Sequence, residues 1–173
     1  GALGFALFAL QQPPTTDPVV LMNVFAQVLP VSIAEVVVCW VVVGGSVAAL
    51  LRHRGWNTYI ANGFALVVSS ILFGVYHFAH SPPFNSVEMV GLLTVVGVGT
   101  GLVYFGGRSF YGALAFHNFM ALTGIVSSLA AADQIVTYQQ PLPPLLATAL
   151  IAVLIVIGME RLFVQDAGNI APG

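Results

Sequence analysis

The sequence predicts an all-α protein that crosses the membrane several times, with about five full helical spans and a truncated helix at its N-terminus. Of its 173 residues, 58% are hydrophobic and only 6% are charged. The mean hydropathy of +0.98 is higher than a soluble domain of this size needs for its core. The apolar runs also have the right length, because a bilayer core takes about 20 residues of helix. We therefore expect a polytopic helical bundle.

The first part of the chain predicts a short helix, a connection and then a long apolar run. Residues 1–10 begin inside an apolar stretch without Met or a basic flank, which indicates the remnant of a longer helix rather than a signal peptide. Residues 11–18 are rich in Pro and Thr and predict a connection. Residues 19–51 are too long for one ordinary span. Because Pro30 interrupts them, we expect either a kinked helix or a short segment at 19–29 before a span at 31–51.

The rest of the chain predicts further spans of ordinary length. They are expected at residues 60–80, 87–105, 110–132 and 144–163. Gly97 and Gly101 have the small-xxx-small spacing that lets two helices approach closely, and we expect them to pack inside the bundle. We accordingly divide the chain into an N-terminal part at 1–18, a transmembrane helical domain at 19–164 and a C-terminal tail at 165–173.

The few charged residues predict the topology and exclude two classes of protein. Alternating spans put all the arginines at one membrane face: Arg52, Arg54, Arg108 and Arg161. Basic residues are retained on the cytoplasmic side, so we expect these loops and the C-terminus on that side or its equivalent. There is no lysine, which excludes a retinal Schiff base and leaves little basic surface for nucleic acid. Cys39 is the only cysteine, so no intrachain disulfide can form.

The candidate functional residues are Glu35, His77 and His117, which lie inside apolar runs. An ionisable side chain in hydrocarbon costs on the order of a few kcal/mol, so each one needs a partner, a water cavity or a metal ion. Together they could act as catalytic groups or as ligands of a divalent metal. By contrast, we expect His53 in a solvated loop and His80 at the membrane interface. Counting residues from the predicted turns puts His117 nearer the inner face than the other two.

Two of the histidines carry local patterns that resemble a known family. Phe73 and His77 form a Phe-x-x-x-His pattern, and a second histidine, His117, lies on a later span. The chain resembles here, over residues 32–129, the CAAX-protease and bacteriocin-processing (CPBP, or Abi) family of intramembrane proteases. That family carries Glu-Glu-x-x-x-Arg, Phe-x-x-x-His and His-x-x-x-Asn/Asp motifs on successive helices of one bundle. The resemblance implies that a glutamate and histidines activate water and that the last motif stabilises the oxyanion.

The chain departs from this pattern in its first and third motifs. If Glu35 is the second glutamate, the first is Ala34 and the arginine is Cys39. Anchoring the motif on the basic Arg52–Trp56 stretch instead places it on residues 39–44 and also loses the glutamate pair. The residue four after His117 is Ala121 rather than Asn or Asp.

These departures predict a proteolytically silent relative that acts as an accessory or structural subunit. We expect such a protein to contact membrane lipids and other membrane subunits through its helices. One alternative is a metal-dependent intramembrane protease that uses Glu35, His77 and His117. Another is a subunit that binds haem or chlorophyll through His77 or His117. Nucleic acid is not an expected partner.

Overall fold

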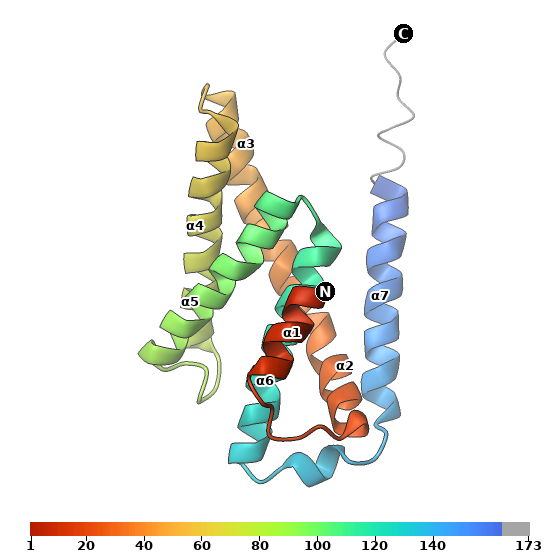
Figure 1. Ribbon diagram of the computed structural model, residues 1–173. Coiled ribbons are helices and arrows are strands. Elements are labelled where there is room, and N and C mark those ends of the chain that lie inside the picture. The colour runs from red at the N-terminus through yellow and green to blue at the C-terminus, as the bar shows by residue number, and fades with distance from the viewer. Residues whose placement is uncertain (164–173) are drawn as a thin grey trace.

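All regular structure in residues 1–163 is helical in the computed structural model, which describes this part of the chain (Figure 1). Five of the helical stretches are long and apolar enough to cross a membrane. The predicted tail at 165–173 lies outside the described residues. The helical elements are α1 (Ala2–Leu10), α2 (Pro18–Glu35), η1 (Val36–Gly44), α3 (Gly45–His53), α4 (Thr58–Tyr76), η2 (His77–Ala79), α5 (Val87–Gly101), η3 (Leu102–Gly106), α6 (Phe110–Ala131), η4 (Ile135–Tyr138) and α7 (Pro143–Phe163).

The first span is one continuous helix over Pro18–His53. Asp17 caps it, since its carboxylate accepts hydrogen bonds from the backbone N–H groups of Val19 at 2.8 Å and Val20 at 3.4 Å. The helix passes through Pro30, so the prediction of a separate segment at 19–29 is wrong. A π-helical stretch, η1, follows directly after Glu35. Such widened turns occur often at functional sites.

The remaining spans agree with the sequence-based boundaries to within a few residues. The helices alternate in direction, as Figure 1 shows, so the α3–α4 turn, the α5–α6 connection and the end of α7 lie toward one end of the bundle. These are the segments that carry the arginines. With five helices long and apolar enough to span a membrane, the chain is a multi-pass integral membrane protein. That this end faces the cytoplasm stays a prediction.

Small residues bring α4, α5 and η1 into close contact. A Cβ atom on Gly97 would lie 3.2 Å from the Cα atom of Ser70, and one on Gly101 would lie 3.0 Å from Nε1 of Trp40. The expected packing of these glycines inside the bundle is thereby confirmed. It allows α5 to pack closely against α4 and also to contact α6, the helix that carries His117.

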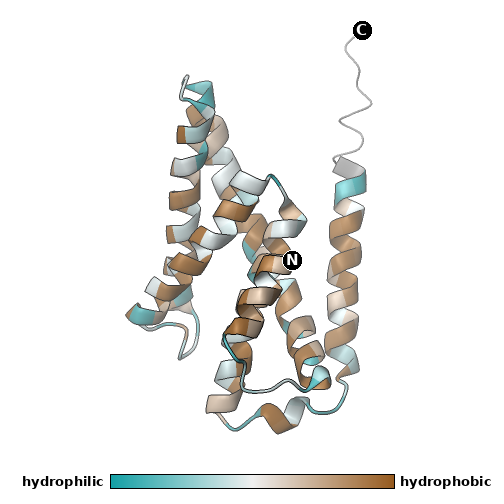
Figure 2. Ribbon diagram, in the orientation of Figure 1, coloured by the Kyte–Doolittle hydropathy of each residue, from teal (hydrophilic) through white to brown (hydrophobic). Residues whose placement is uncertain are grey.

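The last helix, α7, packs mainly against α2 and is tied to it through a loop. The Asn23 amide donates hydrogen bonds to the carbonyls of Tyr138 and Gln140, both at 2.8 Å, and its oxygen accepts from the Leu142 N–H at 3.0 Å. Elsewhere the helices expose apolar side chains along their length, while hydrophilic residues gather in the turns (Figure 2). This outer surface is the part of the protein that contacts lipid.

Candidate active site

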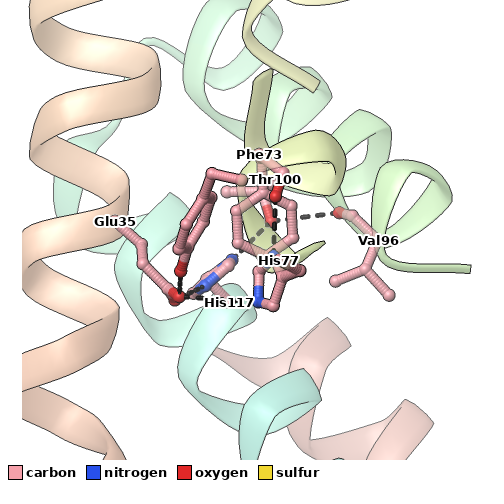
Figure 3. A network of polar contacts seen from close by, with 7 residues as sticks. Glu35, Phe73, His77, Val96, Thr100 and His117 are labelled. Atoms are coloured by element: carbon pink, nitrogen blue, oxygen red, sulfur yellow. Dashed lines mark hydrogen bonds and ion pairs between the residues drawn. The ribbon is translucent and has the colours of Figure 1, made fainter. Parts of the chain in front are cut away.

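Glu35, His77 and His117 meet in the interior of the bundle, although they come from three different helices (Figure 3). Glu35 is the last residue of α2, His77 follows the end of α4, and His117 lies early in α6. Oε2 of Glu35 is 2.8 Å from Nε2 of His117, and its Oε1 is 3.8 Å from Nε2 of His77. Both histidines are buried, and the Glu35 side chain is 11% exposed.

The expectation that His117 lies at a different depth from Glu35 and His77 is wrong. The expectation assumed that all the turns at the arginine end of the bundle lie at the same depth along the bundle axis. In the fold, the connection between α5 and α6 lies deeper in the bundle than the α3–α4 turn (Figure 1). Helix α6 therefore begins at mid-depth, and His117 reaches the level of Glu35 after only two turns.

Thr100 on α5 fixes the proton on one nitrogen of His117. Its hydroxyl donates to the Val96 carbonyl at 3.1 Å, because a carbonyl can only accept. The Thr100 oxygen is then the acceptor for Nδ1–H of His117, also at 3.1 Å. Nε2 of His117 consequently faces the Glu35 carboxylate, and the 2.8 Å contact between them holds one shared proton.

His77 is oriented in the same way by the backbone of its own helix. Its Nδ1–H donates to the Phe73 carbonyl at 2.7 Å, which leaves the lone pair of Nε2 directed at Glu35. The Phe73 ring stands edge-on to both histidines, with centroids 4.7 Å from His77 and 5.0 Å from His117. The phenylalanine of the Phe-x-x-x-His pattern thus separates the two imidazoles and fixes their planes.

Tyr76 supplies a further partner that the sequence did not identify. Its hydroxyl donates to Oε1 of Glu35, the oxygen that faces His77. A buried carboxylate needs such donors, since water is largely excluded from the bundle interior. Tyr76 and Thr100 were missed because neither belongs to a motif. The only available signal was that Tyr76 directly precedes His77.

A cavity of about 260 Å³ opens beside these groups. Glu35, His77 and His117 line it, together with mostly apolar side chains from α2, α4, α5 and α6. Ser32 also lines it, one helical turn before Glu35. The Ser32 hydroxyl is fully buried and has no hydrogen-bond partner within the described residues, which makes it available to a ligand in the cavity.

A second, more apolar pocket lies between the first span and α4. It shares Val31, Glu35 and His80 with the central cavity. Val31 and two further wall residues, Val38 and Leu72, are exposed on the outside of the bundle. The carboxylate of Glu35 can therefore be approached from the lipid side as well as from the interior.

The arrangement does not fit a metal ion. Across residues 1–163, no group of three or more His, Cys, Asp or Glu side chains is placed so that it could hold one. Glu35 and His117 are in direct hydrogen-bond contact, and Tyr76 occupies the other carboxylate oxygen. Both nitrogens of His117 are engaged, so of the two histidines considered as haem or chlorophyll ligands only His77 has a free nitrogen. The metal and pigment predictions gain no support from this geometry.

The positions that depart from the family pattern have different surroundings. Ala34 is exposed on the outside of the helix and Cys39 is buried, while Ala121 lines the cavity without offering a polar atom. Asn118, next to His117, is buried but does not line the cavity, so it does not replace the missing amide. His53 is exposed, as expected, but it is the last residue of α3 rather than part of a loop. His80 is exposed and stacks on His77 with a centroid distance of 4.7 Å.

Comparison with known proteins supports the resemblance seen in the motifs. Neither the curated proteins nor the solved structures contain a match to the chain. The profile of the family described as "Type II CAAX prenyl endopeptidase Rce1-like" matches residues 1–123, which include Glu35, His77 and His117. The match covers more than half of the sequence and confirms the resemblance to the CPBP proteases. The chain belongs to the Rce1-like family of type II CAAX prenyl endopeptidases.

Proposed function

We propose that the protein is an intramembrane peptidase in which Glu35 is the general base. The observation that carries this proposal is the convergence of Glu35, His77 and His117 on one buried cavity. An ionisable cluster of this kind is expensive in a membrane, and a role in catalysis explains its cost.

The gap between Glu35 and His77 suits a water molecule. Oε1 of Glu35 and Nε2 of His77 are 3.8 Å apart, which is too long for a hydrogen bond. A water oxygen about 2.8 Å from each atom can form a triangle with them. Oε1 accepts one hydrogen bond from Tyr76 and retains a lone pair for the water. The water would therefore be held by two acceptors, ready to lose a proton.

The hydrolysis follows from these positions. The water oxygen attacks the peptide carbonyl carbon while Glu35 takes its proton. The C–N bond then breaks, and Glu35 returns the proton to the leaving amine. His117 keeps the shared proton on Nε2 during this cycle, so that Glu35 stays an acceptor, and Thr100 holds the ring in place.

Ser32 is the group best placed to stabilise the oxyanion. Its hydroxyl is buried, lines the cavity and has no partner within the described residues. A preorganised donor of this kind is worth about 10² to 10³ in rate. It would supply part of what the family's Asn/Asp provides, since Ala121 stands at that position.

The substrate we propose is a peptide that carries an apolar modification. The apolar pocket that opens between Val31, Val38 and Leu72 leads from the lipid side to Glu35. The family name indicates prenyl endopeptidases, so a prenylated C-terminal peptide is the first substrate to test.

The test is cleavage of a prenylated peptide by the purified protein reconstituted in liposomes, with products identified by mass spectrometry. We expect cleavage by the wild type and none by His77→Ala. The control is His53→Ala, which removes an exposed histidine and should cleave normally. Cleavage by His77→Ala at the wild-type rate would refute the role of this site.

The second candidate function is a silent accessory subunit. It is favoured by one observation, that Ala34, Cys39 and Ala121 occupy the family's Glu, Arg and Asn/Asp positions while the bundle persists. In that case the wild type would cleave nothing and would co-purify with other membrane subunits. His77→Ala would then change only packing.

A further inference from the structure

A separate pocket of about 460 Å³ lies at the arginine end of the bundle. It is built where α3, α4, η3 and the start of α6 come together. Its lining residues are Gly45, Ala48, Arg52, Thr58, Asn62, Tyr104, Phe105, Arg108 and Phe110. The set combines two guanidinium groups, three uncharged polar side chains and an apolar floor.

The pocket is electropositive. Arg52 and Arg108 both line it, and no acidic residue does. Within residues 1–163 the ion pairs with a carboxylate all involve Glu35, so neither arginine is paired there. Arg52 donates one hydrogen bond to the side-chain oxygen of Asn62 at 3.2 Å. A guanidinium has five N–H donors, so others remain for a ligand. Two charged groups with free donors thus face one space.

Two helix N-termini add to this positive potential. Thr58 is the first residue of α4 and Phe110 is the first residue of α6. The N-terminal end of a helix carries about half a unit of positive charge. Arg108 itself has a backbone φ of 49°, a left-handed conformation that side chains other than Gly rarely adopt.

The pocket lies toward the α3–α4 end of the bundle, away from Glu35. Arg52 is near the end of the span that contains Glu35, and the seventeen helical steps from Glu35 to Arg52 correspond to roughly 25 Å of helix. The exposed Trp56 in the adjacent turn is typical of a membrane interface. Gly45, Ala48 and Phe105 form an apolar part of the lining. The first methylene groups of a bound acyl chain require such a surface.

We propose that this pocket binds the phosphate of an anionic phospholipid. Arg52 and Arg108 would contact the phosphate oxygens, Thr58 and Asn62 would donate to the headgroup, and the first acyl carbons would lie on the apolar floor. Arginine forks match phosphate geometry, and basic pockets between membrane helices bind anionic headgroups.

The test is native mass spectrometry of the purified full chain in a neutral detergent, titrated with phosphatidylglycerol, phosphatidylcholine or inorganic phosphate. We expect phosphatidylglycerol to bind more tightly than phosphatidylcholine. Arg52→Gln and Arg108→Gln should each weaken its binding about fivefold. Arg54→Gln is the matched control, since it removes the same charge two residues away from Arg52 without lining the pocket. It should change the affinity less than about twofold.

Three results would overturn the proposal. One is equal binding of the two lipids, and another is an Arg54→Gln effect as large as that of Arg52→Gln. The third is binding of inorganic phosphate as tight as that of phosphatidylglycerol, which would assign the pocket to a free anion. Thermal unfolding of each variant checks that the bundle is intact, and Arg108→Gln gives a reading independent of Arg52.

Discussion

Glu35 and His117 are 82 positions apart in the chain, yet their side chains share a hydrogen bond of 2.8 Å in the middle of the bundle. The bond joins the end of α2 to the beginning of α6, with Thr100 on α5 holding the far side of the imidazole. Because Glu35 also lies 3.8 Å from His77, the three ionisable side chains form one cluster. The bond to His117 leaves Oε1 of Glu35 to accept a hydrogen bond from Tyr76 and to face Nε2 of His77.

Replacing Tyr76 with phenylalanine tests how Glu35 is held. The Tyr76→Phe variant loses the hydroxyl that donates to Oε1. A hydrogen bond to a charged group is worth about 1.5–3 kcal/mol, so we expect kcat to fall about 10- to 100-fold with KM nearly unchanged. Tyr59→Phe, on an 83% exposed tyrosine of the same helix, is the control. A rise in KM without a change in kcat would argue against a positioning role.

Ser32→Ala tests the proposed oxyanion donor. We expect kcat to fall about 10²-fold, because a preorganised donor would be lost. Thermal stability should stay the same or rise, since the hydroxyl is buried without a partner. Ser69→Ala provides a close comparison, as Ser69 is also buried and unpartnered but does not line the cavity. Equal activity of the two variants would remove Ser32 from the mechanism.

Chelation should leave activity intact. Glu35 and His117 contact each other directly, and the described residues contain no group arranged to hold an ion. We therefore expect the cleavage rate to be unchanged after treatment with EDTA or phenanthroline. A loss of activity that added zinc restores would show that the metal-dependent alternative is correct.

Gly74→Ala tests the contact between α4 and α5. A Cβ atom at this position would meet the Thr94 hydroxyl and would lie 2.9 Å from the carbonyl oxygen of Val90. Because a backbone atom cannot easily move, we expect a destabilisation of about 1–3 kcal/mol, measured by thermal unfolding in detergent. Gly63→Ala on the same helix meets nothing within 4 Å and should stabilise by up to about 1 kcal/mol. Similar melting temperatures for the two variants would contradict this packing.

The sequence predicted the spans well and the site only in part. The thickness of the bilayer sets the length of apolar sequence that a span needs. The boundaries of α4, α5, α6 and α7 could therefore be predicted from the apolar runs in the sequence. Glu35, His77 and His117 could be singled out because ionisable groups are rare in apolar runs. The continuity of the helix through Pro30 could not be predicted, since proline both ends and kinks helices.

The depth of His117 could not be predicted either, because it depends on how far each turn reaches. The same limit hid Thr100, whose position opposite His117 follows from the offset between α5 and α6. Ser32 was inconspicuous because one serine in an apolar helix carries no pattern. Its candidate role is indicated only by the cavity that its side chain lines.

The central claim is that Glu35 acts as the base in peptide hydrolysis, and Glu35→Gln tests it most directly. Gln keeps the size of the side chain and an oxygen for Tyr76, but it cannot take a proton from water. The measurement is kcat on a prenylated peptide in liposomes, beside Glu88→Gln, which changes an exposed glutamate in the first turn of α5. We expect Glu35→Gln to lower kcat about 10² to 10⁴-fold while Glu88→Gln matches the wild type. Wild-type kcat in Glu35→Gln, or no cleavage by the wild type itself, would contradict the account.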